Sequence, residues 1–162
     1  MTIDLSGSAL RLAGEAGLSL TLPLTDVAVR IVGLGWATVD LDRVAADLRL
    51  AEGLAFDVDV RDELLGARGR AVGPVPPDGI RLVILEPFTE GRLAASLARR
   101  GEGPAALYLA PTDSDLTGAI DRLSTGGVRT RSGLTALGPG AIVLGLAAAG
   151  PQLLLVAVPS GP

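Results

Sequence analysis

The stretch GEGPAALYLAPTDSDLTGAIDRL, residues 101–123, contains a glycine-rich turn, a short apolar strand, an acidic loop and most of an amphipathic helix. The segment PAALYLAP (104–111) has the length and apolar content of a buried strand. The segment SDLTGAIDRLSTGG (114–127) has apolar side chains at the helical spacing, namely Leu116, Ile120 and Leu123. The stretch therefore predicts a strand followed by a helix that packs on a sheet.

The same order of elements occurs earlier in the chain. RIVGLGWATV (30–39) has the composition of a strand, and DLDRVAADLRLAEGL (40–54) has that of an amphipathic helix. Three more strands follow each helix, predicted at 55–61, 66–73 and 80–86, and at 128–134, 140–147 and 151–158. This internal repeat predicts an α+β fold built from two tandem βαβββ modules.

The modules span about 30–87 and 104–159, and a linker helix at about 90–100 joins them inside a domain predicted at 30–162. Residues 1–29 lie outside the repeat as an N-terminal extension. Its apolar content fits either a hairpin or a dimer contact, and the hairpin rests on the alternating residues Leu18, Leu20 and Leu22.

The composition limits the chemistry that this chain can perform. Its 162 residues are 48% hydrophobic, which suffices for the core of one domain. The net charge is −4 and the arginines are scattered among acidic residues, which argues against a nucleic-acid partner. The sequence has no His, Cys or Lys, so an imidazole base, a thiolate nucleophile and a lysine Schiff base are excluded.

The sequence shows no membrane or targeting segment. The most apolar stretch, AIVLGLAAAGPQLLLVAVP (141–159), is interrupted by Gly150 and Pro151 and predicts two buried strands. The N-terminus carries Asp4 where a signal peptide would have positive charge. We therefore expect a cytoplasmic protein without a membrane partner.

Three segments, GWATVDLDRVAADL, ILEPFTEGRLAASLARRGEGPAALYLA and DLTGAIDRLSTGGV, resemble in their order and spacing the glyoxalase/bleomycin-resistance, or vicinal oxygen chelate, superfamily. Within it, the pattern is most similar to methylmalonyl-CoA epimerase-like proteins, over about residues 30–159. The resemblance implies a curved, funnel-like sheet of eight strands, a small organic molecule as the ligand, and a homodimer.

In that superfamily four inward-facing residues, normally His, Gln or Glu, bind a metal ion. The corresponding residues here are Gly33, Val83, Ala106 (or Ala105 after a shift of one) and Leu154. None of these side chains offers a donor atom. We therefore expect no metal ion and no cofactor.

Strand alternation places further residues on the face of the lost ligands. The predicted ligand pocket is apolar with three polar groups, and consists of Gly33, Gly35, Arg81, Val83, Leu85, Ala106, Tyr108, Gln152 and Leu154. Two ordinary alternatives stand beside this: Tyr108 as a core tyrosine whose hydroxyl reaches the surface, and Arg81 as a solvent-exposed residue at the start of a strand.

Other polar and aromatic residues have structural explanations. The acidic pairs Asp57/Asp59 and Asp62/Glu63 are expected at solvated strand and turn positions. Glu86 is expected to point away from the pocket, and Trp36 to pack under the first repeat helix.

Three hypotheses about function follow. The favoured one is a metal-independent protein that binds a small, mostly apolar organic molecule in the funnel, as bleomycin-resistance proteins do. The second is a metal-free lyase or isomerase in which Tyr108 and Arg81 stabilise an enolate-like anion. The third is a structural or interaction domain whose funnel is filled by its own side chains.

Overall fold

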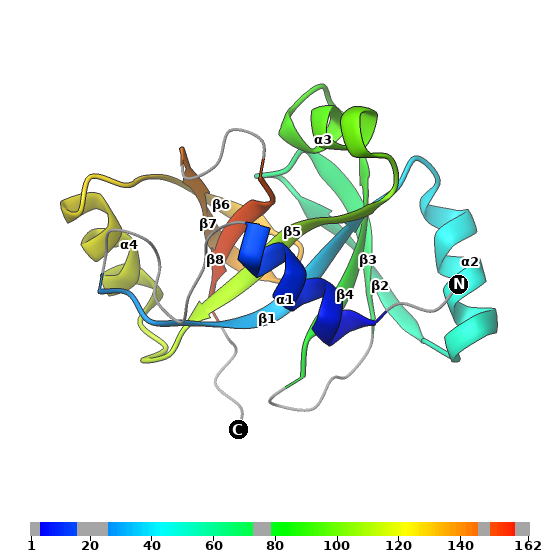
Figure 1. Ribbon diagram of the computed structural model, residues 1–162, viewed down its shortest axis with the longest axis horizontal. Helices are drawn as coiled ribbons and strands as arrows, with labels where there is room; N and C mark the ends of the chain where they lie inside the picture. Colours follow the sequence, from blue (N-terminus) through cyan, green and yellow to red (C-terminus); the bar gives the residue numbers. More distant parts are fainter. Residues whose placement is uncertain (1–3, 16–25, 73–78, 146–149, 158–162) are drawn as a thin grey trace.

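The computed structural model describes residues 4–15, 26–72, 79–145 and 150–157. In chain order the elements are α1 (Leu5–Glu15), β1 (Val29–Ala37), α2 (Leu41–Glu52), β2 (Phe56–Asp62), β3 (Ala67–Val72), β4 (Arg81–Pro87), α3 (Arg92–Arg100), β5 (Gly103–Pro111), α4 (Leu116–Thr125), β6 (Arg129–Thr135), β7 (Gly138–Leu144) and β8 (Gln152–Val156) (Figure 1). The predicted boundaries agree within about two residues, except that β7 ends earlier than expected.

The strands form one curled sheet in the order β2-β3-β4-β1-β5-β8-β7-β6. β1 and β5 pair antiparallel at the centre, and each also pairs in parallel with the last strand of its own module, β4 or β8. The two ends of the sheet meet, because the backbone N–H of Glu63 donates to the carbonyl of Leu134 over 3.0 Å. The α+β fold of two tandem βαβββ modules is confirmed.

Helices cover the outer face of the sheet. α1 and α4 pack against the second module, where Leu107, Leu109 and Leu155 are fully buried. α2 packs on the first module over Leu82 and Ile84, and the ring of Trp36 packs against the same cluster, as predicted.

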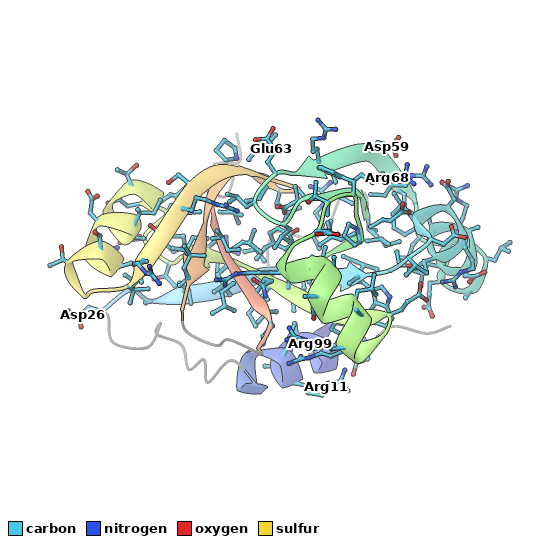
Figure 2. The ribbon with its side chains drawn as sticks, turned by 90° about the horizontal axis from the view of Figure 1, so that it is seen from above. Arg11, Asp26, Asp59, Glu63, Arg68 and Arg99 are labelled. Carbon is cyan, nitrogen blue, oxygen red and sulfur yellow. The ribbon has the colours of Figure 1, made fainter. Side chains whose placement is uncertain are left out.

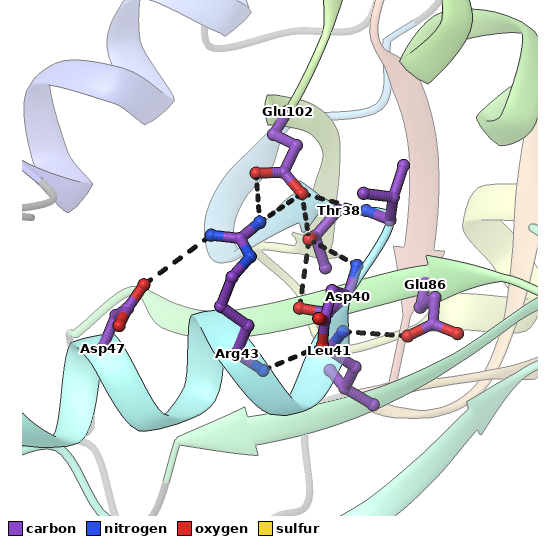
Figure 3. A network of polar contacts seen from close by, with 8 residues as sticks. Thr38, Asp40, Leu41, Arg43, Asp47, Glu86 and Glu102 are labelled. Carbon is purple, nitrogen blue, oxygen red and sulfur yellow. Dashed lines mark hydrogen bonds and ion pairs between the residues drawn. The ribbon is translucent and has the colours of Figure 1, made fainter.

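Side chains from three segments hold the start of α2 (Figure 3). Asp40 accepts a hydrogen bond from the backbone N–H of Arg43 (3.0 Å), and Glu86 accepts one from that of Leu41 (2.8 Å). Glu102, which precedes the apolar part of β5, binds the Arg43 guanidinium with both carboxylate oxygens. Glu86 therefore points toward the outer face, as strand alternation predicts, and this corner ties the two modules together.

The start of the N-terminal extension forms a helix, where a hairpin was one of the two expectations. Ala9, Leu12 and Ala13 are buried against the sheet, and their spacing of three and four residues fits a helix rather than a strand. α1 lies across β5 and β1 (Figure 1). The leucines on which the hairpin rested (Leu18, Leu20 and Leu22) lie outside the described residues, and the dimer contact stays a prediction.

Leu12→Ala is expected to lower the free energy of unfolding by about 2–3 kcal/mol, because it leaves a cavity under α1. The matched control is Leu10→Ala on the same helix, since Leu10 is 69% exposed and Leu12 only 2%. The control is expected to change the free energy by about 0.5 kcal/mol or less. Urea unfolding followed by circular dichroism measures both, and equal effects would mean that α1 does not belong to the core.

The apolar stretch 141–159 contributes to β7 and β8, so its prediction as two buried strands is confirmed. In the part of the chain that the structure describes, the helices are too short or too polar to cross a membrane. The cytoplasmic location stays a prediction.

Candidate functional site

The inner face of the curled sheet is packed with hydrocarbon. Most of the predicted pocket residues meet there, and five of them have 0% exposed surface: Val83, Leu85, Ala106, Tyr108 and Leu154. Leu64, Leu65 and Leu93 pack against them from the surrounding turns and α3. Their role in ligand binding stays a prediction, because in this structure these five residues offer no surface to a ligand.

The residues at the expected metal-ligand positions lie on this packed face. A Cβ atom added to Gly33 would lie 2.7 Å from Leu137 Cδ1 and 3.0 Å from Tyr108 Cδ2, and one added to Gly35 would lie 2.9 Å from the Cβ atom of Ala106. Val83, Ala106 and Leu154 are in the same cluster, and so is the alternative Ala105. These side chains carry no oxygen, nitrogen or sulfur, so they do not fit a metal ion, and we derive no chemistry through one.

One polar group stands in the middle of this hydrocarbon. Asp62, the last residue of β2, accepts hydrogen bonds from the Tyr108 hydroxyl (2.8 Å), the Ala136 N–H (3.0 Å) and the Leu65 N–H (2.9 Å). The expectation that Asp62 is solvated is wrong, since it is fully buried. The curling of the sheet brings the end of β2 under β5 and the β6–β7 turn, and Asp62 links all three.

The neighbouring acidic residues behave as expected. Glu63 is exposed, and Asp59 is exposed and accepts a hydrogen bond from Arg70 Nε over 2.8 Å. The side chain of Asp57 lies outside the described ones.

Burial changes the pKa values of Asp62 and Tyr108, which are bonded to each other. Loss of solvent raises the pKa of Asp62, and the hydrogen bonds from Ala136, Tyr108 and Leu65 oppose that rise. Burial, together with the negative charge of Asp62, raises the pKa of Tyr108 well above its ordinary value. Tyr108 therefore keeps its proton and donates a hydrogen bond to the carboxyl group of Asp62, and its hydroxyl does not reach the surface.

Arg81 and Tyr108 lie in one row across the sheet, since both are register partners of Gly33. Their polar groups nevertheless have different partners, because Arg81 Nε donates to the carbonyl of Val72 on the far side of β4 (2.8 Å). Gln152 is 9% exposed on β8. The lyase or isomerase hypothesis needs Tyr108 and Arg81 to act on one ligand, whereas here the Tyr108 hydroxyl is bonded to Asp62 (2.8 Å).

An open cleft of about 470 Å³ lies beside the packed inner face. Its walls come from the β2–β3 turn, the start of α3, β6 and β7: Glu63, Leu64, Leu65, Gly66, Thr89, Glu90, Gly91, Arg92, Arg131, Ile142 and Leu144. The volume is in the range of small-molecule sites. Sequence patterns did not reveal this cleft, because its walls are turns and strand ends from four separate segments.

The cleft combines an apolar wall with charged side chains of both signs. Arg131 is held in place because its Nη2 donates to the carbonyl of Leu64 (3.0 Å), and among the described residues its other N–H groups have no further partner and can bind a ligand. α3 begins at the cleft, and its N-cap Gly91 has no side chain to accept from the first N–H groups. The positive end of the helix dipole therefore adds to the charges of Arg92 and Arg131, against those of Glu63 and Glu90.

A curled, eight-stranded sheet of paired βαβββ modules defines the vicinal oxygen chelate fold, so the predicted fold is confirmed. The structure is similar to that of a Streptomyces coelicolor methylmalonyl-CoA epimerase variant in complex with 2-nitronate-propionyl-CoA, with a TM-score of 0.68 and 23% identity over 82% of this chain and 98% of that chain. For the methylmalonyl-CoA epimerase from Mycobacterium tuberculosis the TM-score is 0.66, with 22% identity over 88% and 93%.

A hypothetical protein from Bacillus halodurans shares the fold at a TM-score of 0.60 and 16% identity, over 78% of this chain and 92% of that one. No protein-family model and no curated protein matches the sequence significantly. At these identities the likeness defines the fold, and the function has to be argued from the residues of this chain.

Proposed function

We propose that this chain is a metal-independent binding protein of the vicinal oxygen chelate fold, and that its ligand is a small, mostly apolar organic molecule with an acidic group. The observation that carries the proposal is the open cleft of about 470 Å³ beside the inner face. The favoured sequence hypothesis placed the ligand deeper, among residues that are packed together here. We therefore propose that the ligand binds in the open cleft beside the packed inner face.

The walls of the cleft indicate the chemistry of the ligand. Leu64, Ile142 and Leu144 form an apolar wall that favours a hydrocarbon body. Arg131 and the start of α3 favour a carboxylate or a similar anion at one end. The S. coelicolor epimerase was solved with an acyl-CoA analogue, so an acyl-CoA is a reasonable ligand to test here.

The buried pair supports binding rather than catalysis. Tyr108 and Asp62 have no exposed surface and are bonded to each other, so neither can reach a ligand in the cleft. A catalytic acid or base must lie within hydrogen-bond distance of the proton that it transfers. We therefore propose no reaction for this site.

Arg131→Ala is expected to weaken binding of 8-anilinonaphthalene-1-sulfonate, an apolar anion, by about tenfold, because a charge-assisted hydrogen bond is lost. Arg129→Ala is the matched control, since Arg129 is an exposed residue of the same strand and is not part of the cleft. Dye fluorescence measures the dissociation constant, and propionyl-CoA is added as a competitor. If both variants bind the dye as the native protein does, the cleft is not the site.

The filled inner face also supports the third hypothesis, a structural or interaction domain. Native mass spectrometry of the purified protein separates the two ideas, since a binding protein is expected to carry or accept a ligand in stoichiometric amount. The same spectrum tests the homodimer, which we propose from the resemblance. A protein that takes up neither the dye nor a cellular molecule would favour the structural domain.

A further inference from the structure

One edge of the curled sheet lies open. β6 is the last strand in the sheet order, so only one of its sides pairs with a neighbour, β7. The other side meets the turn after β2 at its end, where the carbonyl of Leu134 accepts from the backbone N–H groups of Glu63 (3.0 Å) and Leu64 (3.4 Å). Figure 2 shows β6 as the golden arrow at the edge of the molecule, running toward Glu63.

The backbone direction shows which groups of β6 are free. In an antiparallel strand the N–H and C=O of one residue point to the same side, and the side alternates along the chain. The carbonyl of Leu134 points away from β7, and its register partner Pro139 has no N–H to donate. The pairing with β7 has no register shift, so Thr130 and Ser132 also direct their N–H and C=O groups away from β7. Within the described residues no hydrogen bond reaches these groups.

The side chains along this edge indicate the chemistry of a partner. Arg129 and Arg131 are exposed on one face of β6, and neither forms an ion pair with a described residue. On the other face, Leu134 is 41% exposed. Antiparallel pairing of β6 with β6 of a second copy would bring arginines opposite each other, and like charges at such positions are unfavourable. The charges therefore favour an acidic strand.

We propose that the free edge of β6 binds an extended peptide as an additional strand, in which acidic residues alternate with β-branched residues. The peptide backbone pairs with Thr130 and Ser132, and its carboxylates lie beside Arg129 and Arg131. Its β-branched side chains lie on the face of Leu134. The free stretch before Leu134 accommodates about five residues. This strand site is separate from the small-molecule site proposed for the cleft, although Arg131 borders both.

The test is a titration of the full-length protein against the fluorescein-labelled peptide Thr-Glu-Val-Glu-Thr, followed by fluorescence anisotropy. The peptide is expected to bind saturably and more weakly as salt is added. Ser132→Pro is expected to raise its dissociation constant by about tenfold, because proline has no N–H and its ring obstructs the edge. Ser132→Ala, the matched control, keeps the N–H and is expected to change the constant by less than about twofold.

A second pair of variants tests the charge without changing the backbone. Arg129→Glu is expected to raise the dissociation constant of the peptide by about tenfold, and Arg49→Glu, which makes the same change at an exposed position of α2, by less than about twofold. Equal effects within either pair, or equal binding of the reordered peptide Glu-Glu-Val-Thr-Thr, would overturn the proposal. Sedimentation velocity tests the other occupant: a dimer that Ser132→Pro dissociates would assign the edge to a second copy and would also overturn it.

The edge and the cleft can be tested separately. Ser132→Pro and Arg129→Glu are expected to leave the dissociation constant of 8-anilinonaphthalene-1-sulfonate within about twofold of the native value, because neither residue lines the cleft. Arg131→Ala is expected to weaken binding of both the dye and the peptide. Displacement of the peptide by the dye would place the peptide in the cleft and contradict a site at the edge of β6.

Discussion

Asp62→Ala is expected to lower the free energy of unfolding by about 4 kcal/mol, a large part of the stability of a domain of this size. The variant leaves three buried donors without an acceptor: the Tyr108 hydroxyl and the backbone N–H groups of Leu65 and Ala136. The substitution also removes the hydrogen bonds by which Asp62 connects the end of β2 to β5 and to the β6–β7 turn. Urea unfolding at neutral pH measures the change.

Asp59→Ala is the matched control, because it removes an exposed carboxylate from the same strand. Asp59 is bonded to Arg70 at the surface, and the loss of such a pair costs about 1 kcal/mol or less. If the two variants are equally stable, Asp62 does not hold the modules together. Tyr108→Phe is expected to have an intermediate effect, since it leaves the two backbone hydrogen bonds to Asp62 in place.

The same carboxyl group gives the stability a defined pH dependence. Because burial raises the pKa of Asp62 above its ordinary value of 3.8, the folded state binds this proton more tightly than the unfolded state does. The contribution of this group is therefore fully present below about 3.8 and is lost as the pH rises through the raised pKa. Asp62→Asn, which cannot titrate, is expected to be more destabilising relative to the native protein near pH 4 than near pH 7. A penalty that does not vary with pH would contradict this assignment.

Gly33→His, which places a metal-binding side chain at the first of the predicted ligand positions, is expected to destabilise the protein by about 3–4 kcal/mol. Even a Cβ atom at Gly33 would lie 2.7 Å from Leu137 Cδ1 and 3.0 Å from the Tyr108 ring. An imidazole would have to displace both and would bury its nitrogens among hydrocarbon. Thermal unfolding with and without added Zn²⁺ measures the effect, and Zn²⁺ is not expected to restore the stability.

Val39→His is the control for this substitution, since Val39 is 68% exposed after β1. It is expected to change the free energy of unfolding by about 0.5 kcal/mol or less. A Gly33→His variant that is as stable as the control would show that the inner face has room for a larger side chain. The inner face would then again be a candidate for the ligand site.

The sequence predicted the order of elements well because the signals are local. The apolar residues of the helix at 41–52 repeat every three or four positions, and the strands are short apolar runs bounded by turns. The repeat of these patterns in both halves then defined the topology. The N-terminal extension was predicted less well. Its alternating leucines suggested a hairpin, whereas Ala9, Leu12 and Ala13, which come before them, belong to a helix.

The candidate site was less accessible to sequence reasoning. Strand alternation correctly grouped Val83, Leu85, Ala106, Tyr108 and Leu154 on one face, but it could not show whether that face is hollow or filled. The filling comes from residues such as Leu64 and Leu137, which lie in turns whose positions depend on how far the sheet curls. The cleft, likewise, exists only where such turns meet the start of α3.

The sequence by itself therefore determined the modules, the covering faces of α2 and α4 and the absence of donor atoms at Gly33, Val83, Ala106 and Leu154, because each depends on residue type and short-range spacing. Only the tertiary structure decided that Asp62 is buried, that Tyr108 donates to it and that the open space lies beside the funnel. Asp62 lies 46 residues from Tyr108 and 74 from Ala136 along the chain. Contacts of that kind form when the two ends of the sheet close on each other, and no local pattern of residues encodes that closure.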